Sequence, residues 1–188
     1  MLQGTVIREN DTLDLCLLRV MTGLGATALR RYVLTVAAGN LAWEILQLPL
    51  YRIWHHAGVL RLAIITLTGT CGDIPIAIVS LVCAFSLFGK DRASPPVGPS
   101  VAWTTVLFGL AYTIGSEMVH LRLGIWHYSA LMPRLPILGV GLGPTLQWLV
   151  IPPLALYAAG GRFTDQHTHQ EPALREARGR SPDNRDGA

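Results

Sequence analysis

The chain has 188 residues, of which 51% are hydrophobic and only 14% are charged. A soluble domain carries about 25% charged residues, so this composition is typical of a membrane protein. The net charge of +3 is small and the basic residues are scattered, which excludes the basic surface of a nucleic-acid-binding protein. The three cysteines show neither metal-site nor disulfide spacing: Cys16, Cys71 and Cys83.

The charge is concentrated at the two ends and in short gaps between long apolar runs. This pattern predicts an all-α polytopic membrane protein, a four-transmembrane-helix bundle formed by residues 30–159. Residues 1–29 include Asp14 and Arg19 within their apolar stretch, so we interpret them as a frayed or interfacial extension, with Met21 as a candidate start. Residues 160–188 have no apolar periodicity and predict a disordered cytoplasmic tail.

The predicted spans cover about residues 32–51, 62–88, 101–119 and 139–159. The second span is longer than the ~20 residues that cross a bilayer, so we expect it to tilt or to kink near Pro75. Residues 120–138 are too polar and too rich in proline to span, and we expect an interfacial or re-entrant segment there. Its Trp126 and Tyr128 are predicted to lie at headgroup level.

The distribution of basic residues predicts the orientation. With both termini in the cytoplasm, most of the 15 Lys and Arg residues lie on the cytoplasmic side. The positive-inside rule favours this arrangement. The expected location is therefore the inner (plasma) membrane of a bacterium, with both termini cytoplasmic.

A polar stripe crosses the first predicted span. Asn40, Glu44 and Gln47 stand at i, i+4 and i+7, so a helix places them on one face, and the stretch ends at Tyr51. Polar side chains are costly at membrane depth, and an ionisable one there is a candidate functional group.

The first three spans each carry one acidic residue: Glu44, Asp73 and Glu117. No Lys or Arg lies within the spans to pair with them, so each carboxyl group must be protonated, hydrogen-bonded, bound to a cation or open to water. Other polar residues share their faces or their depth: Thr66, Thr70, Thr113, His120 and Gln147. If these faces meet, the bundle encloses a polar pocket that opens outward.

The candidate catalytic residues are Glu44, Asp73, Glu117 and His120. The candidate binding residues are Asn40, Trp43, Gln47, Tyr51, Trp126 and Gln147. The amides could equally join helices by hydrogen bonds, and Trp126 could anchor the segment at the membrane surface. The Glu117-x-x-His120 spacing occurs in di-iron bundles, but those need a second such pair, so no metal is predicted and no cofactor is assigned.

Several short motifs resemble a group of small uncharacterised four-span bacterial membrane proteins. They are GNLAWE (39–44), LQLPLY (46–51), GD (72–73), GIWHYS (124–129), LMP (131–133) and QW (147–148). The resemblance covers about residues 30–159 and implies topology rather than activity. Glu117 followed by the Gly-x-Trp-x-Tyr motif at residues 124–128 also resembles membrane proteins of carotenoid biosynthesis.

These patterns leave three functions open. The first is an intramembrane enzyme that applies acid/base chemistry to a lipid or isoprenoid, so that the expected partners are membrane lipid and an apolar lipid-like substrate. The second is a proton- or cation-coupled transporter, which would have to oligomerise because the chain shows no internal repeat. The third is a non-catalytic assembly or scaffold protein in which the acids hold a partner helix.

Overall fold

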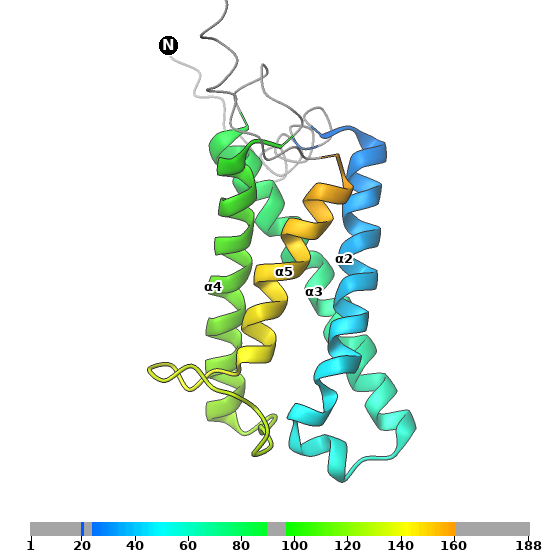
Figure 1. The fold of residues 1–188 in the computed structure, drawn as a ribbon, viewed down its shortest axis with the longest axis vertical. Coiled ribbons are helices and arrows are strands. Elements are labelled where there is room, and N and C mark those ends of the chain that lie inside the picture. The colour runs from blue at the N-terminus through cyan, green and yellow to red at the C-terminus, as the bar shows by residue number, and fades with distance from the viewer. Residues whose placement is uncertain (1–19, 21–23, 90–96, 161–188) are drawn as a thin grey trace, which may run out of the picture.

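The computed structural model describes residue 20, residues 24–89 and residues 97–160, and in this part of the chain it is all-helical, as predicted. Four α-helices form an elongated bundle (Figure 1): α2 (Ala26–Gln47), α3 (Val59–Phe88), α4 (Pro99–Leu123) and α5 (Leu142–Ala158). The predictions for residues 1–19, for Met21 as a candidate start, for residues 90–96 and for the tail from residue 161 onward fall outside the described residues.

Each of the four helices packs against two neighbours, so that they form a ring around the interior of the bundle. Helix α2 packs against α3 and α5, and α4 packs against the same two helices, so α2 faces α4 and α3 faces α5 across the interior. Consecutive helices run in opposite directions (Figure 1). The start of α2 and the end of α5 therefore lie at one end of the bundle, which we call the terminal end. The opposite end, the loop end, holds η1 (Leu48–Leu50), η2 (Arg52–His55) and the connection between α4 and α5.

Proline and glycine set the helix ends at the loop end. Helix α2 ends at Gln47 and passes directly into η1: Leu48 keeps a right-handed helical backbone, but Pro49 has no N–H to continue the α-helical hydrogen bonds. The last residues of the span predicted over 32–51 consequently form the short helix η1 and an extended Tyr51 instead of a continuous helix. Helix α4 ends at Leu123. The next residue, Gly124, has a left-handed φ of 67°, and the backbone N–H groups at this cap donate to the carbonyls of His120 and Leu121.

Two of the helices are long and apolar enough to cross a membrane. They are α2 together with η1, over Ala26–Leu50, and α3, over Val59–Phe88. Helix α5 has 17 residues, which at about 1.5 Å per residue gives roughly 25 Å and falls short of a ~30 Å hydrocarbon core. Helix α4 is longer but carries Glu117, His120 and Arg122 in its last turns.

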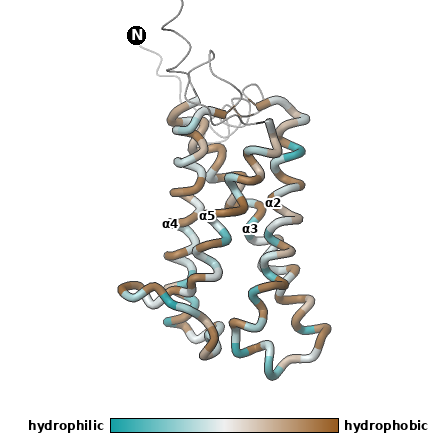
Figure 2. Tube along the Cα trace, viewed as in Figure 1, coloured by the Kyte–Doolittle hydropathy of each residue, from teal (hydrophilic) through white to brown (hydrophobic). Residues whose placement is uncertain are grey.

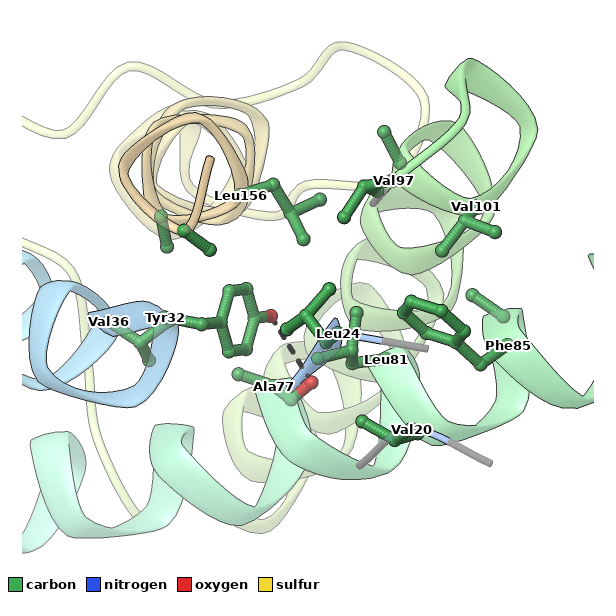
Figure 3. Packing of buried hydrophobic residues seen from close by; sticks show 14 of the residues in the cluster. Val20, Leu24, Tyr32, Val36, Ala77, Leu81, Phe85, Val97, Val101 and Leu156 are labelled. Atoms are coloured by element: carbon green, nitrogen blue, oxygen red, sulfur yellow. Dashed lines mark hydrogen bonds between the residues drawn. The ribbon is translucent and has the colours of Figure 1, made fainter. Parts of the chain in front are cut away.

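The apolar core fills the terminal half of the bundle. Its centre is Tyr32, which is fully buried and whose hydroxyl donates a hydrogen bond of 3.3 Å to the carbonyl of Ala77 on α3 (Figure 3). Leu81 of α3 and Leu156 of α5 pack around this ring. The contact joins three helices and leaves the phenol with a partner in an otherwise apolar setting.

The interior changes character toward the loop end. Most of the buried polar side chains lie there: Asn40, Gln47, Thr66, Thr70, Thr113, Glu117, Thr145 and Gln147. Many of the exposed side chains of the four helices are large and apolar. Hydrophobic residues recur along each helix (Figure 2). The interior of the bundle is therefore mostly apolar toward the terminal end and more polar toward the loop end.

Trp148 lies between these halves, in the apolar core. It is 3% exposed and packs so closely on α4 that a Cβ atom at Gly109 would lie 2.1 Å from a ring carbon. The α4–α5 contact consequently requires glycine at this position.

We predict that Gly109→Ala lowers the free energy of unfolding by about 1–3 kcal/mol, because the rigid indole must move away from the added methyl group. Thermal unfolding of the detergent-purified chain measures this. Gly115→Ala on the same helix is the control, since a Cβ there meets nothing within 4 Å. Equal melting temperatures for the two variants would show that the contact is not tight.

Candidate functional site

Glu44 of α2 lies against a glycine of α3. A Cβ atom at Gly69 would lie 3.3 Å from the carboxyl carbon of Glu44, so the absence of a side chain there makes room for the carboxyl group. Asn40 and Gln47, which share this face of α2, are 3% and 5% exposed. The polar stripe of the first span thus faces the interior of the bundle.

Two glutamines connect Glu44 to the second acid. Gln47 donates a hydrogen bond of 3.3 Å from Nε2 to Oε1 of Gln147, and Gln147 donates one of 2.9 Å from its Nε2 to Oδ2 of Asp73. The Glu44 carboxyl group also interacts with both glutamine side chains. The Gln147–Asp73 bond joins α5 to α3, the two helices that face each other across the ring. We call Glu44, Gln47, Gln147 and Asp73 the amide–acid network.

Glu117 belongs to a second cluster nearer the loop end. It is 6% exposed, and one of its carboxyl oxygens accepts hydrogen bonds from the Tyr128 hydroxyl and, over 3.3 Å, from Nε1 of Trp126. Both donors follow α4 in the chain, so Glu117 holds the segment after Gly124 against the end of its own helix. In this arrangement Glu117 is an acceptor that is already engaged.

His120 supports the same segment. Its ring stacks on Trp126 with 4.1 Å between centroids and 7° between planes, and its Nδ1 donates to the backbone carbonyl of Ser116 over 2.7 Å. His120 therefore orients the indole that binds Glu117. The Glu117-x-x-His120 pair shares a face, as its spacing predicts, but both side chains are occupied by these neighbours.

Tyr51 and Tyr128 lie between the two groups of residues. Their rings are 5.5 Å apart, and Tyr51 lies within electrostatic range of Glu44, Asp73 and Glu117. Burial, followed by the hydrogen bond and charge of Glu117, raises the pKa of Tyr128. Tyr128 thus keeps its proton at neutral pH. It donates to Glu117 while it accepts a 2.9 Å hydrogen bond from the backbone N–H of Gly141.

Backbone and side-chain hydrogen bonds fasten the connection between α4 and α5 to the end of α2. Arg52 N donates to His127 O over 3.0 Å, and Ser129 N donates to Leu50 O over 2.8 Å. On the other side of α2, Nε1 of Trp43 donates to Gly143 O over 3.1 Å. This connection, residues 124–141, therefore covers the polar half of the bundle, and we call it the cap.

The candidate residues from the sequence fall into these groups. Glu44, Gln47, Asp73 and Gln147 meet in the amide–acid network, whereas Glu117, His120 and Trp126 form the cluster under the cap. Tyr51 lies between them, Trp43 binds the start of α5, and Asn40 is buried on the stripe above Glu44.

The expectation that Tyr128 lies at headgroup level as a membrane anchor is wrong. The side chain is 5% exposed, because its hydroxyl satisfies the buried Glu117. Sequence reasoning also missed the role of Gly69, whose missing side chain gives room to Glu44. A glycine in an apolar helix carries no signal of the side chain that it faces.

The grooves of the structure differ from the polar pocket predicted around the acids. One groove of about 440 Å³ lies between α2 and α3, and another of about 240 Å³ lies between α2, α5 and the cap. Their linings are almost wholly apolar, and neither includes a carboxylate. In the described part of the chain, no group of three His, Cys, Asp or Glu side chains is arranged to hold a metal ion.

Comparison of the chain with family models, with curated proteins and with solved structures finds no match. The roles of these residues consequently rest on their contacts. Glu117 and His120 contact the cap, whereas Glu44 and Asp73 belong to the amide–acid network.

We predict that Tyr128→Phe destabilises the cap by about 1–3 kcal/mol, since it removes one donor from the buried Glu117 and the acceptor of the Gly141 N–H. Hydrogen exchange followed by mass spectrometry should show faster exchange across residues 124–141. Tyr112→Phe, at a 56% exposed tyrosine of α4, is the control and should leave exchange unchanged. Unaltered cap exchange in Tyr128→Phe would contradict the assignment.

Proposed function

We propose that the chain is an integral membrane enzyme that applies acid/base chemistry to a lipid or isoprenoid, with Glu44 and Asp73 as the acid/base pair. The observation that carries the proposal is the amide–acid network: two partly buried carboxyl groups on neighbouring helices are linked through the neutral amides of Gln47 and Gln147, beneath an outer surface that is rich in apolar side chains.

The apolar outer surface supports immersion of all four helices. Helices α4 and α5 expose large apolar and aromatic side chains on their outer faces: Trp103, Leu107, Phe108, Tyr112, Val119, Leu149, Val150, Leu154 and Tyr157. Monomeric soluble proteins rarely expose contiguous apolar patches of this kind. Lipid is a suitable solvent for such a surface, and a span as short as α5 is accommodated by local thinning of the bilayer.

The distribution of basic residues gives the proposed orientation of the bundle in the membrane. The loop end carries Arg52, Arg61, Arg122 and Arg134, whereas most of the other basic residues belong to the chain ends and to residues 90–96. The positive-inside rule then puts the terminal end in the cytoplasm and the polar half with its cap on the outer side of a bacterial plasma membrane.

We predict that single cysteines at four positions report this topology in spheroplasts of a strain that expresses a cysteine-free variant. A membrane-impermeant maleimide should label His56→Cys and Ile137→Cys from outside. Ser94→Cys and Ala188→Cys should react only after lysis. Labelling of Ile137→Cys only after lysis, or of Ser94→Cys from outside, would contradict the four-span bundle.

The chemistry follows from what surrounds the two acids. In the described residues no lysine or arginine pairs with Glu44 or Asp73, and the groups that act on them are the amides of Gln47 and Gln147 and the other carboxylates. Shielded carboxyl groups without a cationic partner are the kind that donate or accept a proton in apolar sites. The Glu44 carboxyl group lies beside Gly69, which has no side chain. The Asp73 carboxyl group accepts a hydrogen bond from Gln147.

The division of the interior favours this function over transport. A proton or cation that reached Asp73 would meet the packed core around Tyr32, Leu81 and Leu156 on its way to the terminal end. These residues are fully buried and offer no row of polar side chains. A site that is reached from one side, or from the lipid, is what an enzyme needs.

We predict that cells expressing the wild-type chain accumulate or lose a lipid species relative to vector cells. Glu44→Gln and Asp73→Asn should restore the vector profile at equal protein level, because each removes one titrating group and keeps its shape. Mass spectrometry of total lipid extracts measures this, with Cys71→Ser on the exposed face of α3 as the active control. Identical profiles for vector, wild type and both variants would refute enzymatic action on lipids.

A further inference from the structure

The smaller of the two grooves contains a buried polar atom that has no partner. The groove measures about 240 Å³, and its wall includes Trp43, Leu46, Gln47, Leu50 and Gly143. Gln47 is 5% exposed, and among the described residues its Oε1 has no hydrogen-bond partner. A buried acceptor without a donor destabilises the protein. A ligand that donates a hydrogen bond to it therefore gains binding free energy.

This acceptor faces the groove. A Cβ atom at Gly143 would lie 3.0 Å from Oε1 of Gln47 and 3.5 Å from Leu50, so the oxygen lies beside the bare Cα of a residue that lines the groove. The oxygen is enclosed by protein, and Gly143 forms the part of the groove wall beside it.

The amide–acid network fixes which atom of Gln47 faces outward. Asp73 accepts from Nε2 of Gln147, which leaves Oε1 of Gln147 as an acceptor. Gln47 must therefore present its own Nε2 to Gln147, and its Oε1 is turned away from the network. The groove consequently offers an acceptor and selects a ligand that donates.

The remaining chemistry of the groove sets the ligand class. Its lining carries no charged side chain, so a charged headgroup would be desolvated without compensation. Its volume is below the ~300–1,000 Å³ of pockets that enclose drug-sized ligands, which suits one hydrocarbon chain. Leu46 at the rim is 77% exposed on the outer face, so the groove is reached from the side that faces lipid under the proposed function.

We propose that this groove binds a single-chain lipid alcohol, with its hydrocarbon between α2, α5 and the cap and its hydroxyl donating to Oε1 of Gln47. The inference rests on the proposed function for its membrane setting and names the substrate class of that site. A hydroxyl at this position is connected to Glu44 through one glutamine, Gln47, and to Asp73 through two, Gln47 and Gln147.

Photo-crosslinking tests the proposal in lipid nanodiscs that contain the full chain. The probe is dodecanol with a diazirine in its chain, and peptide mass spectrometry locates the crosslinks. We expect adducts on the groove lining that excess dodecanol abolishes. Dodecyl methyl ether, which has no O–H, should compete about tenfold less well, as the loss of one hydrogen bond to a buried acceptor implies.

Two variants narrow the groove. Gly143→Ala adds a methyl group against Oε1 of Gln47, and Leu46→Trp enlarges a side chain at the exposed rim, where folding is not at risk. Both should reduce crosslinking about tenfold, whereas Gly115→Ala should not, because a Cβ there has open space.

The outcomes separate this inference from the proposed function. Crosslinking that persists in Glu44→Gln, with no lipid change in cells, would refute the enzyme and leave the binding site standing. Equal competition by the methyl ether, stronger competition by dodecylamine or dodecanoic acid, or unchanged crosslinking in Gly143→Ala would overturn the alcohol site.

Discussion

The hydrogen bond from Gln147 to Asp73 is the interaction on which the polar half depends. It crosses the ring of helices, because α3 and α5 face each other and are not neighbours. The Oε1 atom of Gln147 also accepts a hydrogen bond from Gln47 of α2. The side chain of Gln147 therefore links three helices, α2, α3 and its own α5. An amide suits this position because it donates and accepts at once, which neither an apolar residue nor a carboxylate can do.

The division of the interior follows from this arrangement. Toward the terminal end, Tyr32 donates its hydroxyl hydrogen to the carbonyl of Ala77, and the surrounding core is mostly apolar, with Ser80 and Thr105 as buried hydroxyl residues. Toward the loop end, buried acids are satisfied by amides, by Trp126 and by Tyr128, so that the cap is bound through its polar contacts with Glu117. These polar contacts thus link the buried and partly buried acids to the neighbouring helices and to the cap.

The sequence predicted the helices and the inward direction of the polar stripe, because the spacing of Asn40, Glu44 and Gln47 permits only one helical face. It did not predict that Glu117 would contact the cap while Glu44 and Asp73 belong to the amide–acid network. Glu117 is engaged by Trp126 and Tyr128, a contact made by a loop whose path has no periodic signal. It also did not predict the apolar grooves, because Gly143 and Leu46 become neighbours only through packing between α2 and α5.

A structure of the chain in lipid nanodiscs, determined by electron microscopy at side-chain resolution, tests the central claim most directly. We expect lipid density around the outer faces of all four helices and the side chain of Gln147 between Asp73 and Gln47. Helices α4 and α5 outside the lipid, or a Gln147 side chain turned away from Asp73, would contradict it.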